Sequence, residues 1–176
     1  LYPDKTEFLL EEILNKTKLK INYQTSLDGN KKFHDFNRKV NKSYDKVIET
    51  INKINNLKKK NKNRLSRVVV GIAISKQNLS SISNLIDTLL PLGCFLAFGF
   101  VRKSKDVYNI DKKFINFEFT PEEFDKDGNI KFGNNYLNDS DLDYAIEILD
   151  KKVWSKHPDQ MIYAYQKTTL IAKQIL

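Results

Sequence analysis

The stretch Asn22–Gly29, which reads N-Y-Q-T-S-L-D-G, decides between the folds that this chain could adopt. Polar and apolar side chains alternate along it as they do in a β-strand, and Asp28-Gly29 marks a turn at its end. A strand covered by helices on both faces is apolar on both, so this one must turn one face toward water or a polar ligand. The polar face carries Asn22, Gln24, Ser26 and Asp28.

Helical and strand patterns alternate along the chain on both sides of this stretch. The continuous apolar runs Val68–Ile74 and Cys94–Val101 are typical of parallel strands buried on both faces. Because the crossovers between strands contain whole helices, we expect parallel pairing and right-handed connections. The predicted helices begin near Asp4 or Thr6, at Ser43, and at Asn78 or Ser80. We expect Ser43 to cap the second of these helices, and Asn78 or Ser80 to cap the third.

This order of elements indicates an α/β fold, and both a doubly wound sheet and a (β/α) barrel would fit it. In a barrel, alternate residues of each strand face the lumen, and a lumen that binds a polar ligand would accept the polar side chains of the first strand. We therefore predict a partial (β/α) TIM-like barrel with parallel strands. The alternative is an edge strand with one face in water.

The chain divides into two parts by this pattern. Residues 1–103 form the predicted partial barrel, and residues 104–176 form a C-terminal extension that we expect to be mainly a helical cap on the barrel. The extension should contain a strand at Ile115–Phe119, a helical turn at Pro121–Phe124, a helix beginning at Asp139 or Ser140, and a final helix beginning at Pro158.

Length and composition indicate one globular protein outside the membrane. The chain has 176 residues, and no apolar run approaches the roughly 18 residues that span a bilayer. The first residues, Leu1-Tyr2-Pro3-Asp4, do not form a signal peptide, so we expect a cytoplasmic location. The sequence begins with Leu1 and its single methionine is Met161, which favours a truncated or processed product.

A single cysteine limits the metal chemistry of this chain. Cys94 lies in the apolar run G-C-F-L-A-F-G-F, where a small buried hydrophobic side chain is the better interpretation than a catalytic thiol. One thiolate cannot build a Cys-based zinc site or an iron–sulfur cluster by itself. We therefore predict no metal ligands within this chain.

The chain is basic, with a formal net charge of +8. Its densest positive run is Lys58–Arg64, with Arg67 just beyond. The run contains no aromatic residue on which a base could stack, and cations at the end of a helix complement its dipole. A solvated helix end is the better interpretation, and we do not expect nucleic acid as a partner.

Three segments in order resemble the middle of a radical S-adenosylmethionine enzyme. These are the strand end Ser26-Leu27-Asp28-Gly29, the loop His34-Asp35-Phe36-Asn37-Arg38 and the helix start Ser43-Tyr44-Asp45-Lys46. The family pattern is S-[LIM]-D-G, then H-D-x-x-R, then S-[FY]-x-K. The resemblance covers roughly residues 4–103.

The resemblance implies an enzyme with a partial (β/α) barrel, a [4Fe-4S] cluster and S-adenosylmethionine. The cofactor is cleaved reductively to a 5′-deoxyadenosyl radical, which abstracts hydrogen from a substrate that this sequence does not identify. The C-x-x-x-C-x-x-C loop that ligates the cluster is absent from this chain. We therefore expect a portion of such an enzyme, inactive alone, with the missing N-terminal half of the barrel as a partner.

The same resemblance implies three cofactor-binding residues. Ser26 and Asp28 would hydrogen-bond the ribose hydroxyls or the amino-acid portion of S-adenosylmethionine, and Arg38 would pair with its carboxylate. The alternative for Ser26–Gly29 is a tight turn with Gly29 at positive φ. We expect His34 to position its loop by hydrogen bonding rather than act as a base, and Asn78 to cap a helix.

Two other functions fit the residues. A basic α/β module could bind RNA or another polyanion through residues 58–67. A degenerate barrel could instead serve as an interaction partner, because an exposed sheet edge beside the Asn22–Asp28 strand would need a cover.

Overall fold

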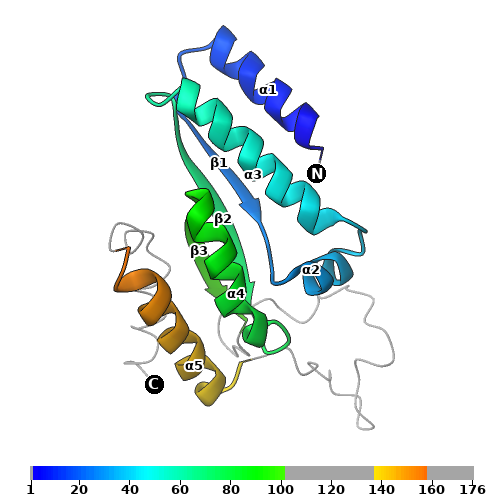
Figure 1. Cartoon of the computed structure of the whole chain (residues 1–176), viewed down its shortest axis with the longest axis vertical. Helices are drawn as coiled ribbons and strands as arrows, with labels where there is room; N and C mark the ends of the chain where they lie inside the picture. Colours follow the sequence, from blue (N-terminus) through cyan, green and yellow to red (C-terminus); the bar gives the residue numbers. More distant parts are fainter. Residues whose placement is uncertain (1, 102–136, 158–176) are drawn as a thin grey trace, which may run out of the picture.

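The computed structural model describes residues 2–101 and 137–157, which contain three parallel strands and five α-helices (Figure 1). Short helical turns extend two of the helices at their C-terminal ends. The elements are α1 (Pro3–Lys16), β1 (Ile21–Ser26), α2 (Lys31–Arg38), α3 (Ser43–Lys60), β2 (Leu65–Ile74), α4 (Leu79–Leu89), a 3-10 turn (Leu90–Leu92), β3 (Phe95–Phe100), α5 (Asp139–Leu149) and a π-helical turn (Asp150–Trp154).

The sheet has the strand order β1-β2-β3, and both pairs of strands are parallel. Gln24 lies opposite Val69, which lies opposite Phe95, so one row of side chains crosses all three strands. The register shifts by one residue next to Ile21, where Ser66 of β2 has no counterpart. The predicted α/β class and parallel pairing are therefore confirmed, while closure into a barrel stays a prediction.

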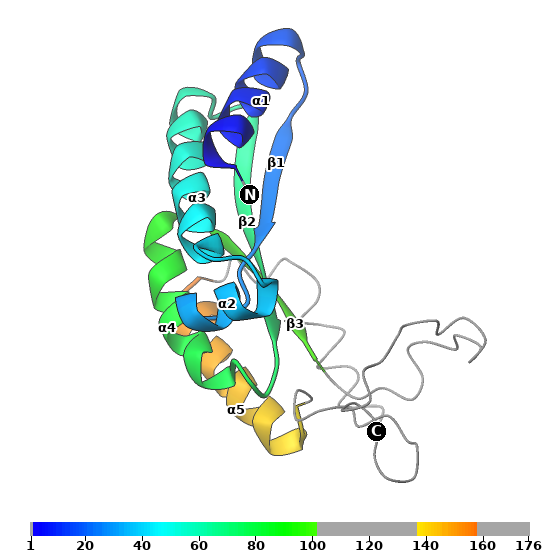
Figure 2. The same cartoon turned by 90° about the vertical axis from the view of Figure 1, so that its right-hand side faces the viewer.

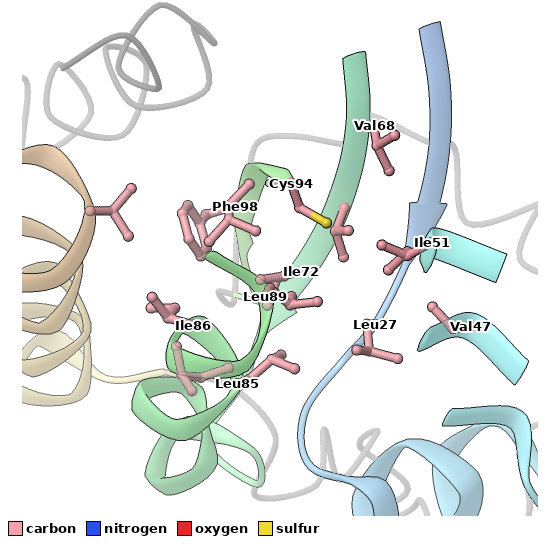
Figure 3. Packing of buried hydrophobic residues seen from close by; sticks show 14 of the residues in the cluster. Leu27, Val47, Ile51, Val68, Ile72, Leu85, Ile86, Leu89, Cys94 and Phe98 are labelled. Atoms are coloured by element: carbon pink, nitrogen blue, oxygen red, sulfur yellow. The ribbon is translucent and has the colours of Figure 1, made fainter. Parts of the chain in front are cut away.

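Helices α1, α3, α4 and α5 form a layer on one face of the sheet, and α2 lies at the C-terminal end of the strands (Figure 2). Apolar side chains from this face, such as Val68 and Ile72 of β2, form one core with the inner sides of the helices. Leu27, directly after β1, belongs to the same core as Val47 and Ile51 of α3 (Figure 3). Burial of these branched side chains against helices is the main source of stability of the fold.

Cys94 lies in this core immediately before β3 and is almost fully buried (Figure 3). Burial raises the pKa of the Cys94 thiol to about 11, so it is not a reactive thiolate at neutral pH. The prediction that Cys94 packs as a small hydrophobic side chain is confirmed.

The opposite face of the sheet, which we call the open face, is not covered by any described helix (Figure 2). Its side chains alternate in sequence with those of the core. They are polar on β1 and small toward the C-terminal ends of β2 and β3. The open face consists of Asn22, Gln24 and Ser26 from β1, Arg67, Val69, Gly71 and Ala73 from β2, and Phe95, Ala97 and Gly99 from β3.

The segment after β1 differs from the prediction. We expected a loop at residues 34–38, but residues 31–38 form helix α2. The side chain of Asn30 caps this helix by accepting a hydrogen bond from the Phe33 N–H at 2.9 Å. The short basic segment has no apolar stripe that would predict a helix. Polar contacts, described below, hold α2 in place instead.

Only part of the C-terminal extension lies within the described residues. Helix α5 begins with a capping box in which Asn138 and Asp141 exchange side-chain and backbone hydrogen bonds. It packs beside α4 in the helix layer, and Lys152 of the π-helical turn pairs with Asp87 of α4. The predicted strand at 115–119, the turn at 121–124 and the helix from Pro158 lie outside the described residues, and the division at residues 103/104 stays a prediction.

No helix among the described residues is both long enough and apolar enough to cross a membrane.

Candidate functional site

A pocket of about 240 Å³ lies at the C-terminal ends of the strands. One wall comes from α2 and the turn before it, and another comes from the end of β2 and the start of α4. This is the end of a parallel sheet at which ligands usually bind. The pocket is lined by Asp28, Phe33, Asn37, Arg38, Ala73, Ser75, Asn78 and Val101.

Asp28 is the central acid of the pocket, and its side chain is only 9% exposed. Arg38 Nη2 lies 2.7 Å from Asp28 Oδ2, and Asn37 Nδ2 donates to the same oxygen at 3.3 Å. Asp28 Oδ1 has no hydrogen-bond partner among the described residues. The carboxylate is therefore neutralised through one oxygen, and its second oxygen has capacity for a further hydrogen bond.

Arg38 is the last residue of α2 and connects the pocket to the open face. Its Nη2 also donates to Ser26 Oγ at 2.8 Å, and its side chain is 43% exposed. Arg38 Nε and Nη1 have no hydrogen-bond partner within the part of the chain that the structure describes. The structure thus brings Ser26, Asp28 and Arg38 together, although Ser26 lies beside the pocket rather than in its wall.

His34 supports this site from behind. The Asp28 backbone N–H donates to His34 Nδ1 at 3.2 Å, and His34 Nε2 lies 3.3 Å from Ser43 Oγ. Because Nδ1 accepts this hydrogen bond, a neutral ring carries its proton on Nε2, which then donates a hydrogen bond to Ser43 Oγ. Burial lowers the pKa of His34 and outweighs the nearby Asp28 carboxylate, so we assign a neutral ring although Asp28 Oδ2 is 4.0 Å away. The prediction that His34 positions its segment is confirmed.

Asp35 links α2 to the start of α3 through hydrogen bonds. Its carboxylate accepts hydrogen bonds from the backbone N–H groups of Lys42 at 3.0 Å and Tyr44 at 2.7 Å. It therefore caps α3, and the prediction that Ser43 caps this helix is wrong, because Ser43 instead contacts His34. Both residues of the H-D motif thus have a structural role in this chain.

Asn78 precedes α4, but its side chain does not cap the helix. Its amide Nδ2 donates to the backbone carbonyls of Asp28 and, at 2.7 Å, Ala73, while its Oδ1 accepts from the Ser75 N–H at 2.8 Å. The predicted capping role is therefore wrong. Asn78 joins the end of β1 to the end of β2, which fixes the two walls of the pocket.

Gly29 allows the chain to pass close to α4. A Cβ atom there would lie 3.0 Å from Phe33 Cδ1 and 3.1 Å from Ser81 Oγ, and the Gly29 φ is 156°. A side chain at this position would push the Asp28 segment away from Asn78. The turn interpretation of residues 26–29 and the site interpretation are thus compatible, because the turn orients Asp28.

The sequence predictions omitted Ser75, Asn37 and Phe33 from the site. Ser75 directly follows β2, and residues at the C-terminal ends of parallel strands are candidates for binding, so its position was a usable signal. Asn37 and Phe33 line the pocket because α2 is a helix, which the sequence pattern did not predict.

The basic run lies at the other end of the sheet. Arg64 is used internally, since its Nη1 donates to the Leu14 carbonyl and its Nη2 donates to the Leu19 carbonyl at 3.2 Å. Lys58 to Lys60 form the last turn of α3, as the helix-end interpretation predicted. The internal use of Arg64 removes one cation from the candidate polyanion surface.

No group of three or more His, Cys, Asp or Glu residues in the described ranges is arranged to hold a metal ion.

Neither the models of known protein families nor the curated proteins include a match to this sequence. The relationship to radical S-adenosylmethionine enzymes therefore depends on the ordered motifs alone and remains a prediction.

Proposed function

We propose that this chain is part of a radical S-adenosylmethionine enzyme and supplies one wall of its cofactor site. The observation that carries the proposal is the convergence of Ser26, Asp28 and Arg38 at the C-terminal end of β1, beside a pocket shared with β2 and β3. In this proposal the sheet is a segment of a (β/α) barrel, and the open face is its lumen.

The open face supports the barrel interpretation over a doubly wound sheet. A second layer of helices would require this face of the sheet to be apolar, but the polar residues Asn22 and Gln24 are exposed on it. Gly71 and Ala73 lie on the same face closer to the pocket, and a Cβ atom added at Gly99 would meet no atom within 4 Å. Small residues next to a polar cluster leave room for a ligand above the sheet.

The charges in the pocket suit a cofactor with hydroxyl and carboxylate groups. Asp28 Oδ1 would accept a hydrogen bond from a ribose hydroxyl, and the exposed edge of Arg38 would donate to the carboxylate of the methionine portion. The pocket volume of about 240 Å³ is below the roughly 300–1,000 Å³ of typical small-molecule sites. The pocket would therefore hold part of the cofactor, with the remainder over the open face.

The iron–sulfur cluster does not fit the residues of this chain. The sequence contains one cysteine, and Cys94 lies in the core. In the proposed enzyme the cluster ligands therefore belong to another segment, and the role proposed for this chain is to bind and orient S-adenosylmethionine.

Calorimetric titration of the 176-residue chain with S-adenosylmethionine tests the cofactor site. We expect saturable binding that Asp28→Asn weakens by about 10-fold or more, because a hydrogen bond to a charged group contributes about 1.5–3 kcal/mol. Asp87→Asn on the outer side of α4 is the matched control and should bind like the unmodified chain. Absence of binding, or equal affinity for Asp28→Asn, would contradict the proposal.

Anaerobic reconstitution with iron and sulfide gives a second test. We expect no iron–sulfur absorbance from this chain, because its one thiol is buried. A stoichiometric cluster on the isolated chain would show that the assignment of the ligands to another segment is wrong.

A further inference from the structure

Ser75 has a buried hydroxyl that makes no hydrogen bond to any residue described by the structure. The residue is 5% exposed, follows β2 directly and lines the pocket. Its backbone N–H donates to Asn78 Oδ1 at 2.8 Å, and its carbonyl accepts from the Leu79 N–H at 3.0 Å. Its Oγ makes no hydrogen bond with any described residue.

Two other buried hydroxyls show how this fold normally satisfies such groups. Thr50 Oγ1 donates to the Lys46 carbonyl at 2.7 Å, and Ser81 Oγ donates to the Asn78 carbonyl at 2.8 Å. Buried hydroxyls without partners are rare because each one has lost its hydrogen bonds to water. The exception at Ser75 occurs at the wall of a pocket, where a ligand can supply the missing partner.

A second incomplete group lines the same pocket. Asp28 Oδ1 lacks a partner among the described residues, while Oδ2 is held by Arg38 and Asn37. The Arg38 guanidinium balances the charge of the carboxylate, so, apart from the exposed donors of Arg38, the pocket offers one acceptor oxygen and one hydroxyl. Two neighbouring hydroxyl groups of a ligand match this pair, since one hydroxyl can donate to Asp28 and the other can exchange a hydrogen bond with Ser75.

We propose that Ser75 and Asp28 together bind a vicinal diol, and that Ser75 is a further ligand-binding residue of the pocket. The assignment of the diol rests on the proposed function, in which it is the ribose of S-adenosylmethionine. Ser75 would then fix the ribose from β2 while Asp28 fixes it from the end of β1.

The test combines a stability measurement without ligand and a binding measurement with nucleosides. Ser75→Ala removes an unpaired polar group, so we expect the melting temperature of the ligand-free chain to rise by about 2–4 °C. Ser66→Ala is the matched control, because Ser66 lies at the other end of β2 and donates to Asn22 Oδ1 at 2.5 Å. It should not raise the melting temperature.

In calorimetric titrations, Ser75→Ala should weaken adenosine binding by about 3- to 10-fold, and Ser66→Ala should leave it unchanged. We also expect Ser75→Ala to leave the affinity unchanged for one of two analogues, 2′-deoxyadenosine or 3′-deoxyadenosine. This analogue is the one that lacks the hydroxyl contacted by Ser75, so the result would identify that hydroxyl of the diol.

Three results would overturn the inference. A lower melting temperature for Ser75→Ala would show that the hydroxyl is a structural partner within the fold. Binding of S-adenosylmethionine and adenosine that is unaffected by Ser75→Ala would reject the inference alone. If the unmodified chain binds neither compound, the proposed function fails and the diol assignment fails with it.

Discussion

The two ends of the sheet each contain an arginine, and the two arginines are used differently. At the N-terminal end, Arg64 spans from β2 to α1 and donates to the carbonyls of Leu14 and Leu19. At the C-terminal end, Arg38 places one nitrogen between Ser26 and Asp28 and keeps donors toward solvent. The first arrangement joins two segments of the fold, whereas the second leaves hydrogen-bonding groups around a pocket.

This difference separates structural from functional polar clusters. A polar cluster that serves only the fold satisfies its members internally, because unpaired buried groups are costly. The pocket end departs from that rule at Ser75 and at one oxygen of Asp28, although His34 and Asn78 beside them are fully engaged. These spare hydrogen-bonding groups are the basis of the proposal that a ligand binds at this end of the sheet.

The largest expected effect comes from Asn78→Ala at the pocket end. The change would leave the carbonyls of Asp28 and Ala73 and the N–H of Ser75 without their partner. We expect a loss of about 3 kcal/mol in the free energy of unfolding, measured by urea denaturation. Asn84→Ala on the exposed side of α4 is the control and should change it by less than about 0.5 kcal/mol. Equal effects would mean that the Asn78 bridge does not stabilise the fold.

Gly29→Ala should lower the free energy of unfolding by a smaller amount, and it tests how tightly the two walls of the pocket are joined. The new Cβ would approach Phe33 and Ser81, and we expect the free energy of unfolding to fall by about 2 kcal/mol. Gly99→Ala places the same methyl group in open space on β3 and should have little effect. A neutral Gly29→Ala would show that the α2 segment can move away from α4.

Arg64→Ala and Arg38→Ala compare the two ends directly. Arg64→Ala should lower the free energy of unfolding by about 1–2 kcal/mol, because hydrogen bonds from a charged group are lost at a partly exposed site. It should leave S-adenosylmethionine binding within about 2-fold of that of the unmodified chain, whereas Arg38→Ala should weaken binding by about 10-fold or more. If both variants affected binding equally, the proposed division between the two ends would be wrong.

The smallest expected effect is a pH dependence from His34. Burial lowers its pKa in the folded chain, so the unfolded chain takes up a proton first as the pH falls. The stability contributed by the neutral ring is fully present above the pKa of about 6.5 of an unfolded chain and declines below it. Urea denaturation at pH 7.5 and 5.5 should show this decline, and the decline should be smaller in His34→Gln.

His157→Gln is the control for this pH experiment, because the chain contains only these two histidines. It should retain the decline of the unmodified chain. If instead His157→Gln abolished the decline and His34→Gln retained it, the neutral assignment of His34 would be wrong.

The fold was predictable where the sequence has a strong period. The apolar runs at β2 and β3 and the helical spacing in α3 and α4 led to the observed parallel order. Helix α2 was not predictable in this way, because its stability depends on polar contacts of Asn30, His34 and Asp35 rather than on an apolar stripe.

The candidate site was predictable only in part. The motif brought Ser26, Asp28 and Arg38 into consideration, and the structure places Arg38 within hydrogen-bonding distance of both Ser26 and Asp28. The bridge from Asn78 to Asp28 joins residues 50 positions apart and depends on the pairing of β1 with β2. Sequence spacing alone does not contain such a contact, and the capping preference of Asn suggested a different role.

The single buried cysteine makes the chain suitable for measuring how often its interior opens. Cys94 lies between α4 and β3, and its thiol is buried and protonated at neutral pH. An alkylating reagent can therefore reach the sulfur only during an opening of that region, and no second thiol would contribute to the signal. The rate of alkylation with and without a bound nucleoside would report whether occupation of the pocket at one end of β2 is transmitted to the centre of the domain.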